Sequence, residues 1–379
     1  MTSTNRWVIL FTVFLAAFSF LFSMQAAPPL IPAIILEFNL SYTAAAGLML
    51  FVALPAIVIA IPGGFLADRY GNKRLCITGL VLVCLGNFLT VMAPSFVLLQ
   101  GSRAILGIGG ALLLSAAPPL IFQWFSGREL NLALGIWAIN MPLATVLSFN
   151  LLGRVESIYG WRTGFWIATV LTAVILVIFK ILIKEKKVDN AAFSLAALKN
   201  IPMWILALIW GSFNVAVISL TTWGKTLFTD FKGFPPVQAD FLAGLIMLLA
   251  FTTPLTGYLA GRLGKRRLLI LFSLLGMTVC LALLPVLGNT FTVVLLVVLG
   301  LFTALAPPCV FALPPELLGR ENAGLGFGVL TTAQNLGVIL GPLLVGLVLD
   351  ITHNEVVVYS TMALFSALGA FLVYLLKVR

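Results

Sequence analysis

A basic turn occurs twice in this chain, and its two copies lie about half a chain length apart. The first copy, GFLADRYGNKRL, spans Gly64–Leu75, and the second copy, GYLAGRLGKRRL, spans Gly257–Leu268 of the 379 residues. Each copy joins two long apolar segments. A motif that recurs at half-length between apolar segments predicts a membrane protein built from two related halves.

The composition indicates that lipid solvates most of the surface. Hydrophobic residues make up 61% of the chain and charged residues only 9%, whereas a soluble domain carries about 25% charged residues. Apolar segments long enough to cross a hydrocarbon core of about 30 Å recur from end to end. We predict an all-α membrane protein with twelve transmembrane helices, which lie near Val8–Ile35, Thr43–Leu66, Leu75–Met92, Phe96–Ala117, Asn131–Leu152, Thr163–Ile183, Pro202–Trp223, Ala239–Ala260, Leu268–Leu287, Phe291–Leu313, Ala323–Leu349 and Val356–Leu376.

The basic residues predict how these helices are oriented. With the N-terminus inside, seventeen of the 22 Lys and Arg residues fall on the cytoplasmic side of the predicted spans. This asymmetry is the positive-inside rule. The net charge of +10 then meets anionic lipid of the inner leaflet, so no nucleic-acid partner is expected. We predict a multi-pass protein of a prokaryotic plasma (inner) membrane, with both termini cytoplasmic.

Two further matches support the division into halves. Gly127-Arg128-Glu129 recurs as Gly319-Arg320-Glu321, and Ala117-Pro118-Pro119, which closes the fourth predicted span, recurs as Ala306-Pro307-Pro308, which interrupts the tenth. Each half has an even number of predicted spans, so the two halves form a parallel repeat about an axis along the membrane normal. The predicted domains are an N-terminal six-helix bundle (1–183), a cytoplasmic linker (184–200) and a C-terminal six-helix bundle (201–379).

At this point the residues resemble the Major Facilitator Superfamily over the whole chain. The first copy of the turn matches the family's signature loop between helices two and three, except at Asn72, where a basic residue is usual. The second copy keeps the shape but has Gly261 in the position of Asp68. The stretch from Arg103 to Gly110 is similar to the fourth-helix motif, and the chain resembles the cyanate and nitrate carriers of the family. The resemblance implies two pseudo-symmetric bundles that rock about a shared substrate site.

The resemblance also implies that the signature loop forms a gate. The carboxylate of Asp68 would accept hydrogen bonds from the first amides of helix eleven and lock the outward-open state. The tight turn itself needs a residue that tolerates positive φ, a role that suits Gly71. The basic residues of the loop can pair with acids, Glu316 among them, or with lipid phosphate. The predicted gating residues are Gly64, Asp68, Arg69, Gly71, Lys73, Arg74, Arg128, Glu129 and Glu321.

Polar side chains within the predicted spans are the candidates for contact with a solute, because polar groups are costly to bury in a membrane and often mark a transport path. Arg103 would either bond helix backbone, take part in proton coupling, or bind an anion. The amides would either line the site or join helices, and the tryptophans would either stack on substrate or pack. The predicted substrate-binding residues are Gln25, Arg103, Trp137, Asn140, Trp210, Asn214, Gln334 and Asn335.

These observations predict a secondary active or facilitative transporter that moves a small solute by alternating access. The predicted spans hold Arg103 but no acid near mid-membrane, which favours an anion as the solute, because a bound anion would offset a buried cation. Asp240 and Asp350 lie near the outer ends of their spans. A proton-coupled multidrug exporter is the alternative, and a receptor on a carrier fold is a further one. The coupling proton or ion is left open.

Other functional classes lack the residues they require. No catalytic constellation is visible near either membrane interface, so an enzyme and a cofactor are not expected. No Cys or His cluster has metal-ligand spacing, and the sole histidine is His353. The expected partners are the solute and membrane lipid, and we expect a monomer.

Overall fold

The regular structure of this protein is helical throughout the part of the chain that is described. The structure, a computed structural model, describes residues 6–125, 133, 136–137, 139–183, 199–318 and 323–376. Ten helical segments within these residues are long and apolar enough to cross a membrane. Two more predicted spans are present as α7 (Asn140–Tyr159) and as the broken helix Pro236–Leu263. The all-helical fold and its apolar spans are therefore as the sequence predicts.

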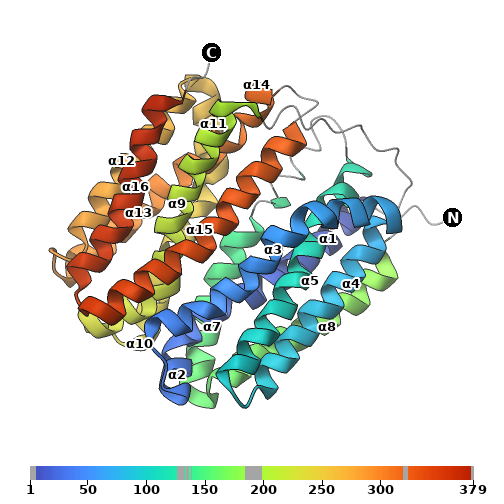
Figure 1. Ribbon diagram of the computed structural model, residues 1–379, viewed down its shortest axis with the longest axis horizontal. Helices are drawn as coiled ribbons and strands as arrows, with labels where there is room; N and C mark the ends of the chain where they lie inside the picture. Colours follow the sequence, from blue (N-terminus) through green and yellow to red (C-terminus); the bar gives the residue numbers. More distant parts are fainter. Residues whose placement is uncertain are drawn as a thin grey trace. The chain divides into compact units, whose positions relative to one another are not determined.

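Contacts divide the helices into two compact units, and the first is N-terminal. It comprises Met1–Asn39 and Gly47–Ala191. In this unit α4 packs along α5, and α1 contacts α5, α7 and α8 (Figure 1). The helices of this part of the chain are α1 (Arg6–Gln25), α2 (Ala27–Phe38), α3 (Tyr42–Tyr70), α4 (Asn72–Met92), α5 (Phe96–Phe122), α7 and α8 (Trp161–Leu182).

The second unit comprises Ala192–Arg379 together with a short piece from earlier in the chain, Leu40–Ala46. Here α9 packs along α15, and α12 contacts both α13 and α16 (Figure 1). Its elements are α9 (Ile201–Thr226), the π-helical η2 (Leu227–Phe231), α10 (Pro236–Leu249), the 3₁₀ turn η3 (Ala250–Thr252), α11 (Thr253–Leu263), α12 (Arg266–Leu283), α13 (Asn289–Phe311), α14 (Pro314–Leu318), α15 (Ala323–Thr352) and α16 (Glu355–Leu375).

Prolines change the helix ends relative to the sequence prediction. The first predicted span consists of two helices, because α1 ends at Gln25 and α2 begins at Ala27, just before Pro28 and Pro29. The pairs Pro118-Pro119 and Pro307-Pro308 do not end or interrupt their helices as predicted; they lie within α5 and α13, which run on to Phe122 and Phe311. Proline removes an N–H donor but keeps a helical φ, so a helix can continue past it when neighbours accommodate the freed carbonyl.

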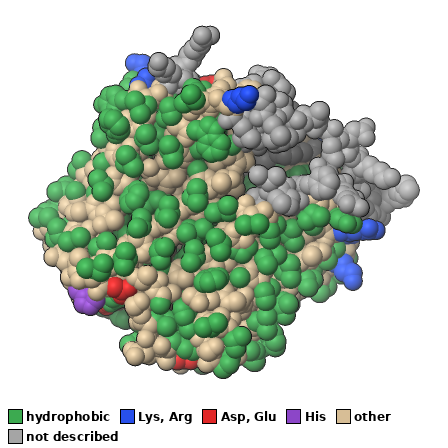
Figure 2. Space-filling model, in the orientation of Figure 1, with side chains coloured by type: hydrophobic (Ala, Val, Ile, Leu, Met, Phe, Trp, Pro, Cys, Tyr) green, Lys and Arg blue, Asp and Glu red, His purple; other side chains and the backbone are tan. Residues whose placement is uncertain are grey.

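The surface of the described residues is mostly apolar. Figure 2 shows hydrophobic side chains over most of the described part of one face, with few charged side chains among them. Large apolar side chains such as Val170, Phe272 and Phe371 are more than half exposed. In water such a surface would aggregate, whereas a bilayer solvates it.

Glycines set the distance between helices inside each unit. A Cβ atom at Gly107 of α5 would lie 2.3 Å from the Val52 carbonyl oxygen of α3, and one at Gly109 would lie 2.6 Å from the Gly79 oxygen of α4. In the C-terminal unit, a Cβ at Gly341 of α15 would lie 2.7 Å from the Val215 oxygen of α9. Small residues at such positions let helix backbones approach closely, which is how helices associate in lipid.

The Gly107 contact can be tested with a control on the same helix. Gly107→Ala should lower the thermal unfolding midpoint in detergent by several degrees, because the new methyl group meets backbone that cannot rotate away; overpacking of this kind costs about 1–3 kcal/mol. Gly101→Ala should leave the midpoint unchanged or raise it, since nothing lies within 4 Å of its Cβ and alanine is the better helix former. Equal midpoints for the two variants would contradict the close approach of α3 and α5.

Candidate functional site

At the junction between α1 and α2, backbone carbonyls inside the N-terminal unit lack donors from their own helix. In a continuous helix, the carbonyls of Met24 and Gln25 would accept from the N–H groups four residues on. Those residues are Pro28 and Pro29, which have no N–H. Buried carbonyls without a partner are costly, so side chains from other helices must supply donors here.

Arg103 of α5 supplies one of these donors and also bonds two other backbone carbonyls. Its side chain is fully buried. The guanidinium donates from NH2 to the Met24 oxygen at 3.0 Å, from NH1 to the Ser23 oxygen at 2.9 Å, and from Nε to the Leu48 oxygen of α3 at 3.3 Å. It also lies 5.6 Å from the ring centroid of Phe165. The backbone-bonding role foreseen for Arg103 is therefore present, and contact with a solute stays a prediction.

Gln25 belongs to the same polar cluster. Its backbone oxygen accepts from Ser148 Oγ of α7 at 2.6 Å, and its side-chain Nε2 donates to Thr145 Oγ1 at 2.7 Å. From α4, Asn87 Nδ2 donates to Ser23 Oγ at 2.7 Å. Polar side chains from α4, α5 and α7 thus surround the end of α1, and two of them, Arg103 and Ser148, bond the carbonyls that Pro28 and Pro29 free.

Asn140 differs from these residues because its amide has no hydrogen-bond partner in the described part of the chain. It is the first residue of α7 and only 2% of its surface is exposed, yet neither Nδ2 nor Oδ1 bonds a described residue. A buried amide without a partner costs folding free energy. Such a group can be retained for a function, such as bonding a ligand. Trp137 precedes it and is half-buried. Asn140 is therefore a predicted substrate residue whose amide forms no hydrogen bond to the described residues.

In the C-terminal unit, two of the predicted residues lie together on α9. The Trp210 ring stacks on Phe213 at 4.9 Å, and Phe311 of α13 meets it edge-on at 5.0 Å. The indole Nε1–H of Trp210 is buried and makes no hydrogen bond to a described residue. Asn214 donates to the Trp210 carbonyl at 2.7 Å, so this amide serves its own helix. Gln334 and Asn335 lie half-buried on α15.

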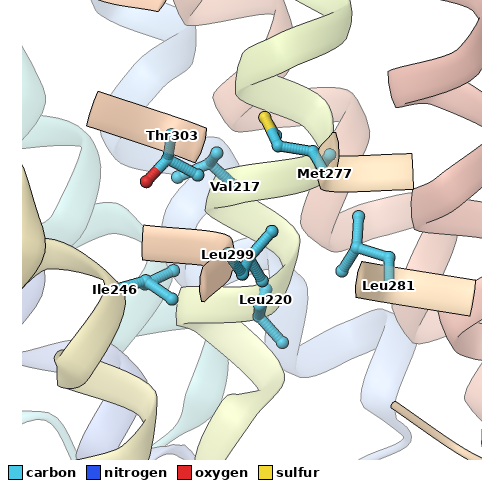
Figure 3. Close-up of a pocket in the computed structure, with 8 residues that line it drawn as sticks. Val217, Leu220, Ile246, Met277, Leu281, Leu299 and Thr303 are labelled. Atoms are coloured by element: carbon cyan, nitrogen blue, oxygen red, sulfur yellow. The ribbon is translucent and has the colours of Figure 1, made fainter. Parts of the chain in front are cut away.

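A small gap lies in the core of this unit. It lies among side chains of α9, α10, α12 and α13, including Leu220, Ile246, Met277 and Thr303 (Figure 3). The gap is too small for a water molecule, and the hydroxyl of Thr303 already bonds the Gly300 carbonyl. It is a packing feature between apolar side chains.

A buried ion pair was missed by the reading of the sequence. Lys225 of α9 and Asp240 of α10 lie 3.2 Å apart, and each side chain is at most 5% exposed. From the sequence alone, Asp240 is placed near the outer end of its span, and Lys225 has no predicted role. The available signal was the placement of two opposite charges on either side of one short connection, between apolar segments. Burying such a pair is expensive, so it is a candidate functional element.

The repeated turn has the backbone expected from its glycines. Gly71, between α3 and α4, has φ of 92°, and its counterpart Gly264, between α11 and α12, has φ of 63°. The gating roles of these loops stay predictions. Lys73 is half-buried and Arg74 exposed, and both lie in the first turn of α4, which follows the repeated turn. Of the other predicted gating residues, the side chains of Gly64, Asp68 and Arg69 and the whole of Arg128, Glu129 and Glu321 lie outside the described residues.

Basic residues of the second copy of the turn tie helices of the C-terminal unit together. Arg266 pairs with Glu316 of α14, an acid that we considered as a partner for the first copy. Arg267 donates to the carbonyls of Val373 and Tyr374 at the end of α16, both at 2.9 Å. A cation at the last carbonyls of a helix satisfies them and complements the helix dipole.

Comparison with known proteins agrees with this architecture. The profile of the Major Facilitator Superfamily matches residues 13–252 and 238–379. The human lysosomal dipeptide transporter MFSD1 is 24% identical over 78% of this chain and 70% of its own. The probable nitrate transporter NarT of Staphylococcus aureus is 25% identical over 85% of this chain and 84% of its own. This relative confirms the resemblance to nitrate carriers.

A solved structure has the same fold. It is a crystal structure of a bacterial homologue of the human lysosomal transporter Spinster, in an inward-facing and unoccupied conformation. It superposes with a TM-score of 0.79 at 15% identity, covering 99% of this chain and 98% of its own. With the family profile, the relatives and the helical units in agreement, the chain belongs to the Major Facilitator Superfamily and is a multi-pass membrane transporter of small solutes rather than an enzyme.

Proposed function

We propose that this transporter is a secondary carrier of small solutes with an anionic group, and that it works by alternating access. The observation that carries the proposal is Arg103. Its formal charge is fully buried, and no described carboxylate lies within ion-pairing distance of it. Carbonyl oxygens satisfy its hydrogen bonds but do not cancel its charge. A buried cation of this kind is stabilised when an anion binds near it.

The relatives are compatible with this class of solute. Nitrate is an anion, and a dipeptide carries a carboxylate at its C-terminal end. We also propose that residues 1–183 and 201–379 act as the two moving bundles, joined by a linker at 184–200. The basic residues favour a plasma (inner) membrane with both termini on the cytoplasmic side.

Charge and hydrogen bonding at Arg103 can be separated by substitution. Arg103→Gln keeps N–H donors for the freed carbonyls but removes the charge, and Arg103→Lys keeps the charge but loses the forked geometry. In proteoliposomes supplied with radiolabelled nitrate, small carboxylates and dipeptides, the Gln variant should lose uptake by about 10- to 100-fold, because a hydrogen bond to a charged group contributes about 1.5–3 kcal/mol. The Lys variant should lose less.

The matched control removes an exposed cation of the same unit. Arg162 pairs with Glu37 at 2.7 Å, and its side chain is 37% exposed. Arg162→Gln should therefore leave uptake within about twofold, since exposed pairs contribute at most about 1 kcal/mol. Melting temperatures of all variants separate lost folding from lost binding. A folded Arg103→Gln protein with the parent's rate and KM for anions would remove Arg103 from solute binding.

Asn140 provides a second test, in which stability and activity should change in opposite directions. Asn140→Leu replaces an unpartnered buried amide by an apolar side chain of similar size, so the protein should be as stable or more stable. If the amide bonds the solute, uptake should fall at least about tenfold, because the buried hydrogen bond to the solute is lost. Asn150→Leu on the same helix is the control, since that amide already donates to the Val146 carbonyl at 2.8 Å. Unchanged uptake by folded Asn140→Leu would contradict the assignment.

Proton-coupled export of amphipathic compounds remains the second candidate, because Lys225 and Asp240 form a buried pair that could exchange a proton. The double substitution Lys225→Gln with Asp240→Asn removes both charges and leaves neither unpaired. Under the export function, efflux of a fluorescent drug driven by a proton gradient should be lost in this variant while drug exchange without a gradient persists. Anion uptake that is independent of the gradient in the parent would reject this candidate.

A further inference from the structure

The start of α3 is held by a carboxylate from a helix more than 300 residues later in the chain. Asp350 lies in the last turn of α15. Its Oδ1 accepts from the Tyr42 N–H and its Oδ2 from the Thr43 N–H, both at 2.7 Å. The first N–H groups of a helix have no partner within the helix, and their partial positive charge favours an anion. Asp350 therefore caps α3 with both of its oxygens.

The rest of this helix end is satisfied locally. Ser41 Oγ accepts from the Ala44 N–H at 3.1 Å, and the Ser41 carbonyl accepts from the Ala45 N–H at 3.0 Å. Ser41 and Asp350 together account for all four of the first N–H groups. Because two of the four depend on Asp350, removing that carboxylate would leave two donors of α3 without their partner.

Side chains around Asp350 hold the same turn. The Tyr42 ring lies edge-on to Trp223 of α9 at 5.5 Å and to His353 at 6.2 Å. Gly346 of α15 leaves room for the turn, because a Cβ there would lie 2.9 Å from the Tyr42 carbonyl oxygen. These contacts explain why Leu40–Ala46 groups with the C-terminal unit, whereas the remainder of α3, from Gly47 onward, groups with the N-terminal unit.

A helix whose first turn belongs to one unit and whose body belongs to the other must lose one set of contacts when the units rearrange. We propose that Asp350 is a gating residue: its carboxylate holds the first turn of α3 in this conformation, and the two hydrogen bonds break and re-form in each transport cycle. The proposal rests on the alternating access proposed above. Asp350 belongs neither to the signature loop nor to the polar cluster around Arg103.

The release of this turn can be measured without any solute. Ala46, at the end of the turn, is 1% exposed, so Ala46→Cys places a buried thiol there. A membrane-impermeant maleimide is added to oriented vesicles from one side and then from the other. The parent chain, with its own Cys76, Cys84, Cys280 and Cys309, gives the background. Asp350→Asn in the Ala46→Cys protein should raise the labelling rate from one side by roughly tenfold or more, because charge-assisted bonds to the helix end are lost.

The matched control removes another acid near the same end of α15. Glu355 pairs with Lys232 at 3.5 Å, whereas the backbone N–H groups of Tyr42 and Thr43 at the start of α3 donate to Asp350. Glu355→Gln should leave labelling of Ala46→Cys at the parent's rate. Asp350→Glu, which keeps the charge, should restore part of the protection. One-sided labelling distinguishes gating from unfolding, which would also expose the buried Cys280 and Cys309.

Two results would overturn the proposal. Asp350→Asn and Asp350→Ala could both label at the parent's rate, or Glu355→Gln could raise labelling as much as Asp350→Asn does. Because labelling needs no solute, failure of anion uptake leaves this test intact. Likewise, an inert Asp350 would leave the proposal on Arg103 standing, so the two ideas fail separately.

Discussion

Backbone polar groups inside a membrane have no water to bond, and this constraint shapes the N-terminal unit more than any other. Pro28 and Pro29 remove the donors that Met24 and Gln25 would use, and the fold replaces them with Arg103 and Ser148. The need for replacement donors explains why a guanidinium sits fully buried among apolar helices. It also explains why Ser148 of α7 bonds the Gln25 carbonyl at the end of α1.

The C-terminal unit meets the same requirement in a different way. Single polar side chains bond carbonyls of the neighbouring helix: Trp223 Nε1 donates to Pro342, Ser273 to Phe302 and Ser366 to Leu274. These bonds accompany close approaches such as that of Gly341 to α9. The unit also buries Lys225 and Asp240 as an ion pair, whereas the N-terminal unit buries Arg103 without a described carboxylate. The two halves share a repeated turn, but they differ in how they satisfy their buried polar and charged groups.

Much of this architecture could be predicted because it depends on local properties. Hydropathy located the spans, and the repeated glycines predicted the positive φ of Gly71, matched by Gly264. Arg103 stood out because a charge within an apolar segment is rare. The hydrogen-bond partners of such residues were not predictable. Asp350 and Tyr42 are 308 positions apart, and the sequence around one gives no indication of contact with the other. The burial of Asp240 depends on how α9 and α10 pack against each other, and the hydropathy of a single span does not predict that packing.

No described carboxylate pairs with Arg103, and this buried charge has an electrical consequence. A membrane potential acts on net charge and contributes about 2.3 kcal/mol for each elementary charge moved across 100 mV. Lys225 and Asp240 together carry no net charge, so voltage exerts little force on them when they move as one. The guanidinium carries one positive charge in the empty carrier, and a bound monovalent anion would cancel it. Voltage would then act mainly on the empty carrier, so the step that returns it would set how steeply transport responds to membrane potential.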